Sequence, residues 1–426
     1  MPEKETMNRE ELGLVDSSTE GALSFSLTSE IGLIPIENAT INVYLAGDMD
    51  NIVRQVSTNS VGQTEELLLE APPIVYSERP DQEQKPYAEY NFRIMAEGYE
   101  TVNISGAEIL SGVTALQPVV MRPVELAEGQ ENIVIPEHTL YGDYPPKIPE
   151  AEVKPVDESG EIVLSRVVIP EYIVVHDGVP GDSSAPNYYV RYADYIKNVV
   201  SSEIYATWSE NTIYANILAV MSFTLNRVYT EWYRNRGYNF TITSSTAYDQ
   251  KWIYGRNIYK NISFYVDSII NNYMSRPGIR QPIFTSYCNG TTATCTGLSQ
   301  WGSKYLGDEG YRPIEIMRYY YGNDIYINTT DFISGIPSSW PGSNLERGSA
   351  GMKVRQMQEQ LNRIAQNYPL IPRIAVDGVF GPATERAVRV FQSVFGLPAN
   401  GIVDFPTWYK ISQIFVGVSR ISEPGT

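Results

Sequence analysis

The sequence predicts a multidomain α+β protein with an N-terminal β-sandwich, a central mixed α+β domain and a C-terminal three-helix unit. The chain has 426 residues. A chain of this length is usually too long to fold around a single hydrophobic core. Apolar and polar residues alternate through residues 22–122, whereas later segments repeat apolar residues at helical spacing. Proline-rich or Gly/Ser-rich stretches separate these regions. Together these three observations favour two to four domains of different fold.

The alternation in residues 22–122 predicts a small β-sandwich. Its strand-like segments are "ALSFSLTS", "ATINVYLAG", "YNFRIMAEGYETVNIS" and "GVTALQPVVM", with turn clusters between them. A proline-bearing insertion, Ala71 to Tyr87, is expected to loop out, and residues 1–21 are expected to be flexible. The sandwich contains no cluster of groups that could act together chemically.

Residues 123–166 form a proline-rich, acidic tether that includes "YGDYPPKIPEAEVKPVDESG". Such a composition cannot build a core and prefers extended or polyproline conformations. We therefore expect the tether to be open to proteolysis.

Residues 167–335 are expected to form the α+β domain. "IPEYIVVHDG" predicts a strand, and "NYYVRYADYIKNVVSSEIYATW" leads into a helix. The next helix is predicted to begin at the N-cap Asn211 and to end before Gly237. Another helix is predicted over Ile258–Met274, and the last begins at Pro313.

A Gly/Ser/Pro linker, residues 336–347, precedes the helical unit 348–426. The first helix has Val354 and Leu361 on one face. The second helix starts at Pro382 and stops at Gly396, the expected start and stop residues. The third helix carries Trp408.

Charge is unevenly distributed along the chain. Residues 1–165 carry a net charge of −21 and residues 166–426 a net charge of +3. This acidic balance argues against nucleic acid as a partner and suggests different roles for the front and the body. The sequence contains no run of about 18 apolar residues, so no membrane span is predicted. The first residues lack the pattern of a secretory signal, so synthesis in the cytoplasm is expected.

Cysteine and histidine are scarce. Cys288 and Cys295 are separated by six residues and could close a disulfide loop, but reduced thiols are expected in a chain without an export signal. His138 and His176 have no second ligand at useful spacing. The sequence therefore predicts no metal site and no cofactor.

The C-terminal unit contains the phrases "GSAGMKVRQMQEQLN", "VDGVFGPATERAVRVFQ" and "GLPANGIVDFPTW". On these it resembles the peptidoglycan-binding three-helix domain family, which implies binding of a glycan-peptide polymer. The landmark residues also have structural explanations, so the residues that contact the ligand stay open. The landmarks are Asp377, Gly378, Phe380, Gly381, Thr384 and Trp408.

The central domain contains "DYIKNVVSSEIYATWSENTIYANILAVMSFTLNR" and "GLSQWG". On these segments it resembles the SpoIID-type lytic transglycosylases, which cleave the glycan strands of peptidoglycan. The phrases "PEYIVVHDGVP", "HTLYGDYPPKIPEAEVKP" and "SGIPSSWPG" are similar to those of the SleC-type cortex-lytic enzymes of clostridial spores, and that likeness covers nearly the whole chain. The resemblance implies that Glu203 occupies the catalytic position and that the sandwich with the tether is a prosegment.

This implied chemistry needs a carboxylic acid that protonates the leaving oxygen, after which the muramyl 6-hydroxyl attacks the anomeric carbon. Burial against Tyr205 and Trp208 would favour the protonated form that a general acid needs. The "GLSQWG" segment would form a facing wall, in which Trp301 either stacks on sugar or is simply buried. The expected substrate-binding residues are Tyr205, Trp208, Tyr248, Asp249, Ser299, Gln300 and Trp301.

The chain departs from the family at its metal ligands. Many SpoIID-type proteins have a His/Cys set near "TSSTAYDQ" that binds zinc, and this sequence has none of those residues. Amidase activity, credited to SleC-type enzymes, usually needs a zinc-bound water or an activated nucleophile, and is not expected here. The alternatives are a non-catalytic peptidoglycan-binding coat or cortex protein and a general cell-wall lysin.

The resemblance also implies a zymogen made in the mother cell, placed at the cortex or coat of the spore and cut by a serine protease of the germination pathway. The expected cleavage window runs from Arg122 to Glu137, which is polar, acidic and without strand periodicity. Alternatively, the sandwich is a folding chaperone or an adhesion module. Spore cortex peptidoglycan is the expected partner, with neither nucleic acid nor membrane.

Overall fold

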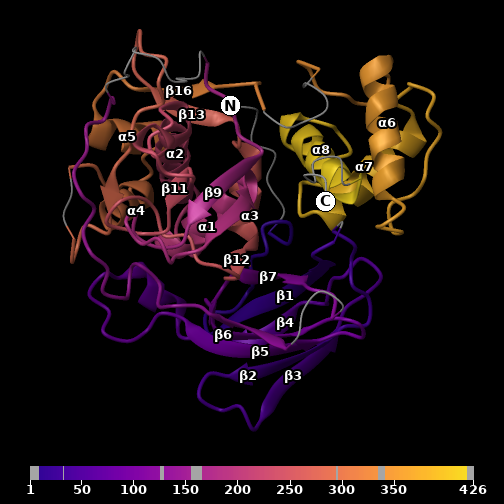
Figure 1. The fold of residues 1–426 in the computed structure, drawn as a ribbon, viewed down its shortest axis with the longest axis horizontal. Coiled ribbons are helices and arrows are strands. Elements are labelled where there is room, and N and C mark those ends of the chain that lie inside the picture. The colour runs from indigo at the N-terminus through magenta and orange to yellow at the C-terminus, as the bar shows by residue number, and fades with distance from the viewer. Residues whose placement is uncertain are drawn as a thin grey trace.

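The computed structural model describes residues 9–31, 33–124, 129–154, 166–293, 296–333 and 341–419. Figure 1 shows a β-rich part in indigo and purple, a mixed part in magenta to orange, and a helical part in yellow. The protein is thus a multidomain α+β structure with a helical C-terminal region. Parts of the predicted N-terminal, cleavage, tether and linker segments lie outside the described residues.

Two sheets form the sandwich. One has the order β12-β7-β1-β4 and the other β3-β2-β5-β6-β8. Their apolar faces meet in a common core, in which Phe25 contacts Phe92 at 4.9 Å between ring centroids. The strands are β1 (Glu20–Ser29), β2 (Thr40–Leu45), β3 (Ile52–Ser57), β4 (Leu67–Glu70), β5 (Ala88–Met95), β6 (Thr101–Ile109), β7 (Thr114–Met121) and β8 (Gln130–Val134).

Three details of this region differ from the expectations. Leu12 is buried and Leu14 bridges Val113, so residues 9–19 pack on the sandwich instead of being flexible. The insertion contains the 3-10 helix η1 (Ile74–Glu78), whose Ser77 is buried against the central domain. The cleavage window includes β8, which pairs with β6 and is therefore not free of strand structure.

The central domain contains most of the helices and several short strands. Its longest helix has Ser209 as N-cap, two residues before the predicted Asn211. The segment predicted as one helix over Ile258–Met274 divides into a strand, a shorter helix and a second strand. The elements are β9 (Tyr172–His176), β10 (Asn187–Arg191), α1 (Tyr192–Glu203), α2 (Glu210–Tyr229), η2 (Arg234–Arg236), β11 (Ile242–Thr243), β12 (Ile258–Tyr259), α3 (Lys260–Ser268), β13 (Asn272–Ser275), β14 (Tyr287–Cys288), β15 (Leu298–Ser299), α4 (Gln300–Asp308), α5 (Pro313–Tyr321) and β16 (Tyr326–Thr329).

The sandwich and the central domain share one hydrophobic core. Strand β12 of the central domain pairs with β7 through Ile258 and Tyr259. The buried cluster runs without interruption from the sandwich to Tyr205 and Tyr259. A buried ion pair, Arg256 Nη2 to Glu108 Oε2 at 2.7 Å, joins the same two parts. The sandwich is therefore attached through a protein-like interior and not only through the tether.

Residues 137–154 of the tether, which we call the strap, lie on the central domain. The strap has no helix or strand, as its composition predicted. Its His138, Thr139 and Lys154 are nevertheless buried, because their partners belong to the central domain and the sandwich. A segment that cannot build a core of its own thus completes the core of another domain.

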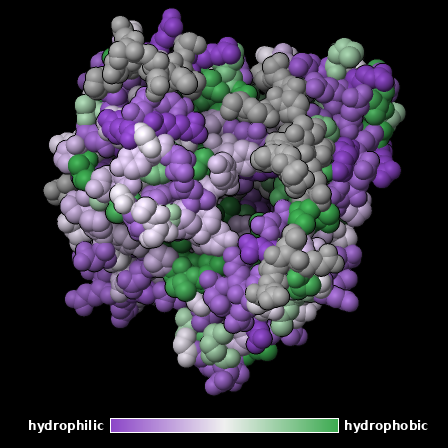
Figure 2. Space-filling model, in the orientation of Figure 1, coloured by the Kyte–Doolittle hydropathy of each residue, from purple (hydrophilic) through white to green (hydrophobic). Residues whose placement is uncertain are grey.

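The C-terminal unit consists of α6 (Met352–Ile364), α7 (Pro382–Val394) and α8 (Phe405–Ser419) around a separate core. It contacts both other parts: Gln63 Nε2 donates to the Val394 carbonyl at 2.8 Å, and Tyr409 of α8 packs into the main core. Figure 2 shows a largely hydrophilic face, hollowed near its centre where the three parts meet. None of the helices described is both long and apolar enough to cross a membrane.

Candidate active site

Glu203 is the last residue of α1, and its side chain faces inward. The helix ends there because Ile204 adopts an extended backbone conformation. Glu203 is 5% exposed. A carboxyl group at this depth needs hydrogen-bond partners, since burying an unpaired polar group is costly.

Both carboxyl oxygens of Glu203 have such partners. Oε1 accepts from the backbone N–H of Lys251 at 2.8 Å and lies 3.4 Å from the Tyr287 hydroxyl. Oε2 accepts from Gln300 Nε2 at 3.1 Å and lies 3.4 Å from the Thr139 hydroxyl. These partners come from four separate segments, so the tertiary fold fixes the carboxyl group in one orientation.

A cavity of about 40 Å³ opens beside Glu203. This volume can hold a water molecule but not a pyranose ring. None of the described residues that line it comes from the sandwich. They are Thr139, Tyr144, Pro145, Pro146 and Lys147 of the strap, with Glu203, Thr246, Tyr287, Cys288, Asn289, Ala293 and Gln300.

Burial perturbs the titratable side chains around this cavity. Burial raises the pKa of the Tyr287 phenol well above its usual value, and nearby Glu203 adds to the effect. Burial also raises the pKa of Tyr144 to about 12. The pKa of Lys147 falls to about 8, because burial outweighs the attraction of Glu203 and Asp249. Such perturbed groups around a cavity are typical of functional sites.

The aromatic residues expected to contact sugar are buried against one another. Tyr205, Trp208 and Trp301 form a cluster, with 4.9 Å between the ring centroids of the two tryptophans. Trp208 Nε1 donates to the Ser77 carbonyl of the sandwich at 2.9 Å. Trp301 is 3% exposed. Trp301 is therefore buried, which is one of the two alternatives that the sequence left open for it.

The "GLSQWG" segment contributes one direct contact to the carboxyl group. Gln300 reaches Glu203, whereas Ser299 caps α4 by accepting from the Gly302 N–H at 3.0 Å. The glycines do allow close approach, but to neighbouring protein. A Cβ atom on Gly297 would lie 1.8 Å from the Ser286 carbonyl oxygen.

Asp249 is not a cleft residue in this structure, contrary to the prediction. It is 0% exposed, and its Oδ1 accepts from Arg227 Nε at 2.7 Å. Its Oδ2 accepts from the Tyr233 and Thr243 hydroxyls, each at 2.7 Å. Tyr248 is half-buried, and its carbonyl accepts from Arg227 at 3.1 Å. Both residues therefore hold the loop that presents the Lys251 N–H to Glu203.

Cys288 is disulfide-bonded, which corrects the expectation of reduced thiols. Cys295, the other cysteine of the sequence, lies outside the described residues. Cys288 borders the cavity, next to Asn289. Among the residues that the structure describes, no group of three or more His, Cys, Asp or Glu side chains is placed to hold a metal ion.

Several contributors to the site were not predicted. They are the backbone N–H of Lys251, the Tyr287 hydroxyl, and Thr139, Tyr144 and Lys147 of the strap. Lys251 directly follows the "TSSTAYDQ" segment, and this segment was the sequence signal that could have placed Lys251 at the site. The strap residues lie in a segment whose composition indicated only a linker.

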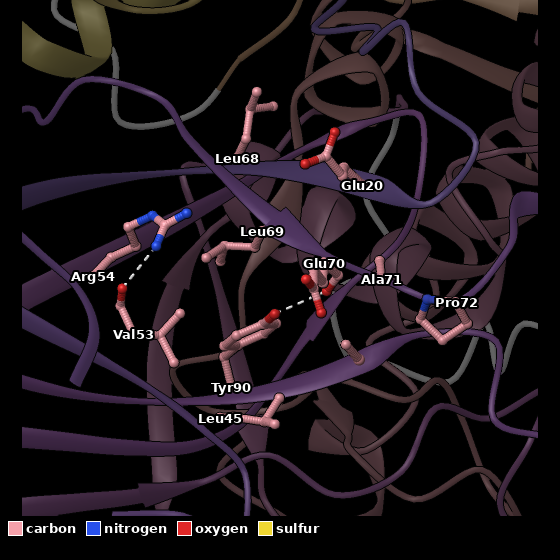
Figure 3. Close-up of a pocket in the computed structure, with 11 residues that line it drawn as sticks. Glu20, Leu45, Val53, Arg54, Leu68, Leu69, Glu70, Ala71, Pro72 and Tyr90 are labelled. Carbon is pink, nitrogen blue, oxygen red and sulfur yellow. Dashed lines mark hydrogen bonds between the residues drawn. The ribbon is translucent and has the colours of Figure 1, made fainter. Parts of the chain in front are cut away.

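A larger hollow, of about 470 Å³, lies in the sandwich (Figure 3). Apolar side chains such as Leu68 and Leu69 line it together with Arg54. The bonds drawn in Figure 3 stay within the sandwich, for example from the Tyr90 hydroxyl to the Glu70 carbonyl at 2.9 Å. Among the described residues that line this hollow, we find no acid held like Glu203.

The C-terminal landmarks hold two equivalent loops. Gln358 Nε2 donates to Asp377 at 2.9 Å and to Thr384 at 3.2 Å, while its Oε1 accepts from Gly378 N–H at 2.8 Å. Gln392 repeats this arrangement with Asn400, Gly401 and Thr407 at 2.9, 2.8 and 3.2 Å. Phe380 and Trp408 are buried in the core between the helices. In this structure these landmarks have structural roles, and Gly381 is the N-cap residue of α7.

Among solved structures, the likenesses are slight. Hydroxyquinol 1,2-dioxygenase from Pseudomonas putida DLL-E4 is 10% identical over 26% of this chain and 59% of that chain, with a TM-score of 0.18. A point mutant of Acinetobacter radioresistens catechol 1,2-dioxygenase is 13% identical over 28% of this chain and 58% of that chain, with a TM-score of 0.18. These scores are too low to carry an argument.

Two sequence comparisons match parts of this chain. A zinc D-Ala-D-Ala carboxypeptidase from Streptomyces albus G is 45% identical over 76 residues, which make up 18% of this chain and 28% of that protein. The chain thus spans little more than a quarter of that relative. Residues 351–411 match the family model of a peptidoglycan binding domain. The chain therefore carries a C-terminal peptidoglycan-binding domain behind its mixed α+β body.

Proposed function

We propose that this chain is a lytic transglycosylase that cleaves the glycan strands of peptidoglycan, with Glu203 as its general acid. The observation that supports it most is the Glu203 carboxyl group, buried, held at both oxygens and facing a cavity. The peptidoglycan-binding domain of the same chain supplies the substrate class. The resemblance of the central domain to SpoIID-type enzymes supports the reaction type.

In the proposed reaction the Glu203 carboxyl proton passes to the glycosidic oxygen as the bond from that oxygen to C1 of the muramyl residue breaks. The muramyl 6-hydroxyl oxygen then attacks C1, and its proton passes to the Glu203 carboxylate, which restores the acid. No water enters, so one carboxyl group serves both steps. Gln300 and the Lys251 N–H keep the carboxyl oriented throughout.

We further propose that the uncut chain is a zymogen that acts on spore cortex during germination, after deposition at the cortex or coat. One feature supports a closed state of the uncut chain: the sandwich covers Trp208, whose Nε1 donates to the Ser77 carbonyl. A serine protease of the germination pathway would cut between Arg122 and Glu137. The exposed positions beside β8 are the accessible part of that window.

The test compares Glu203→Gln with wild type on purified cortex and on vegetative wall, after cutting each chain at a protease site inserted between Val124 and Gly129. We expect the variant to lose about 10²–10⁴-fold in the release of anhydro-muropeptides. Glu309→Gln is the matched control, since Glu309 is an exposed glutamate at the end of α4. The control should behave as wild type.

Each rival function gives a different result. If wild type binds wall but releases no fragments, the chain is a non-catalytic peptidoglycan-binding protein. If Glu203→Gln releases anhydro-muropeptides at the wild-type rate, Glu203 is not the acid. Equal digestion of cortex and vegetative wall would indicate a general lysin.

A further inference from the structure

We propose that the strap is a permanent wall of the Glu203 site, and that Lys147 is a positioning residue whose ammonium group stabilises the carboxylate that Glu203 becomes during the reaction. This inference rests on the proposed transglycosylase function. It separates the strap from the sandwich, although both belong to the same acidic front of the sequence and the His138 N–H donates to the Tyr87 hydroxyl of the sandwich at 3.1 Å. The two ends of the strap hold it against the central domain, and Lys147 supplies the positive charge at the cavity.

The C-terminal half of the strap completes the interior of the central domain. Glu150 forms a two-bond pair with the buried Arg227, at 2.6 and 2.9 Å. The Lys154 side chain is 2% exposed, and its ammonium lies 3.6 Å from the Phe284 ring centroid. The backbone of Lys154 exchanges hydrogen bonds with the Gln281 amide at 2.7 and 3.3 Å. Removing this half would leave a buried guanidinium and a buried amide with fewer partners, which is strongly unfavourable.

The N-terminal half is anchored next to Glu203 itself. Thr139 donates from both its hydroxyl and its backbone N–H to the Ser202 carbonyl, at 2.8 and 3.3 Å. The buried His138 ring lies 4.5 Å from the Tyr205 ring. The strap is therefore fixed on both sides of the cavity. Between these anchors Asp143 is exposed.

Lys147 places a cation between these anchors. Its Nζ donates to the Asp249 carbonyl and lies 3.4 Å from the Thr246 carbonyl. It also lies 4.9 Å from the ring centroid of Tyr287, whose hydroxyl is 3.4 Å from Glu203. Of the described residues that line the cavity, Lys147 alone carries a positive charge.

Asp249 and Glu150 both pair with Arg227. The Lys251 ammonium lies 5.2 Å from the Tyr144 ring centroid, and Lys251 is outside the lining of the cavity. Lys147 and Glu203 are left as the cation and the carboxyl group that share one cavity. The charged and titratable groups around this pair are Tyr144, Glu150, Arg227, Asp249, Lys251 and Tyr287.

An ammonium group in this position acts on the proposed reaction. When Glu203 gives its proton to the glycosidic oxygen it becomes a carboxylate, and the fixed charge of Lys147 stabilises that developing anion. Lys147 touches neither the bond that breaks nor the bond that forms.

The first experiment compares Lys147→Met and Lys147→Arg in the chain cut between Val124 and Gly129. We expect Lys147→Met to lower kcat by about tenfold, with KM within about threefold of wild type. Lys147→Arg keeps the positive charge and should restore kcat to within about threefold of wild type. Lys304→Met is the matched control, because Lys304 is a buried lysine that pairs with Asp308 outside the cavity.

An unchanged kcat in a folded Lys147→Met protein would overturn the role of Lys147. Circular dichroism identifies a variant that fails to fold, and Lys147→Arg then carries the test, since an unchanged charge predicts an unchanged kcat. A folded Lys147→Arg protein with the kcat loss expected of Lys147→Met would equally contradict the proposal.

The second experiment needs no activity. Hydrogen exchange of the strap is measured before and after the same cut, at the Thr139 and Ile148 amides, which donate to the Ser202 and Ala247 carbonyls. We expect both amides to remain protected after the sandwich is separated. Loss of protection would show that the strap leaves with the sandwich and would overturn the proposal. If the cut protein cleaves no glycan yet keeps the strap protected, the proposed function fails and the strap assignment stands.

Discussion

At the scale of single residues, two acids of the central domain share burial but differ in what surrounds them. Glu203 faces a cavity and is bonded by uncharged donors. Asp249 faces a guanidinium, a phenol and a threonine, with no part of it exposed. Both are placed at the site from the sequence, Glu203 by the family resemblance and Asp249 as a further candidate for the cleft, because a sequence does not show what surrounds a carboxylate.

We expect Asp249→Asn to lower the free energy of unfolding by about 3–5 kcal/mol, because it leaves a buried guanidinium with an incomplete partner. At temperatures where it stays folded, it should still cleave glycan. Urea denaturation followed by tryptophan fluorescence checks the first point, with the exposed Asp331→Asn as control. Unchanged stability together with lost cleavage would return Asp249 to the role of a substrate contact.

At the scale of elements, the C-terminal unit contains the same glutamine–loop arrangement twice. Gln358 of α6 and Gln392 of α7 each bind a loop that begins with Asp-Gly or Asn-Gly and continues to a threonine. Each buried amide satisfies backbone and side-chain groups of the loop that leads into the next helix. The loops are therefore as firmly held as the helices they join.

Replacing either glutamine by leucine should cost about 1–3 kcal/mol, because the buried loop groups lose their partners. Both variants should also bind peptidoglycan less well in a sedimentation assay. Gln366→Leu is the control, since that residue is exposed at the end of the same region. Normal stability in both variants would mean that the loops are held by other contacts.

At the scale of the whole molecule, an uncut chain could be inactive for either of two reasons. The acidic front could repel the substrate, or the sandwich could cover part of the central domain. The acidic front would repel the carboxylates of peptidoglycan, whereas the sandwich covers Trp208 and shares a core with the central domain. No described residue of the sandwich lines the Glu203 cavity. If the sandwich inhibits by covering the central domain, it would therefore act through the cluster of Tyr205, Trp208 and Trp301.

We expect removal of the cut sandwich to speed cortex lysis at low salt and at about 0.15 M salt alike, where exposed charges are screened beyond roughly 8 Å. Turbidity loss is measured for the intact chain, the cut chain, and the cut chain after separation of the sandwich. A gain confined to low salt would indicate repulsion. Equal rates for all three would refute the zymogen proposal.

The buried pair of Glu108 and Arg256 makes the attachment of the sandwich pH-dependent. Burial outweighs the attraction of Arg256 and raises the pKa of Glu108 to about 7, above its ordinary value of 4.5. The attached form therefore binds more protons than the separated form between these values. Attachment loses stability as pH rises from about 4.5 to about 7 and changes little beyond that.

After the cut, we expect the sandwich to dissociate more readily at pH 7 than at pH 5. Glu108→Gln should remove most of this dependence, because an amide does not titrate. Gel filtration at the two pH values measures the bound fraction, and Glu100→Gln, a glutamate of the sandwich outside this pair, is the control. Identical dissociation at both pH values in wild type would contradict the assignment.

The sequence by itself determined the local features of this protein. Alternation predicted the strands of the sandwich, Pro382 and Gly396 bounded α7, and the loop phrases identified the peptidoglycan-binding unit, because these signals depend on near neighbours in the chain. It also selected Glu203 and Gln300, which do meet.

The tertiary structure decided which side chains surround Glu203 and which parts are inseparable. The strap reads as a linker because it lacks apolar periodicity, yet its Lys147 lines the cavity and its Lys154 is buried. From the sequence, Trp301 could equally stack on a sugar or lie in the core. Its packing against Trp208 in the tertiary structure shows that it lies in the core. Burial, ion pairing and shared cores are set by residues distant in sequence, so no local pattern encodes them.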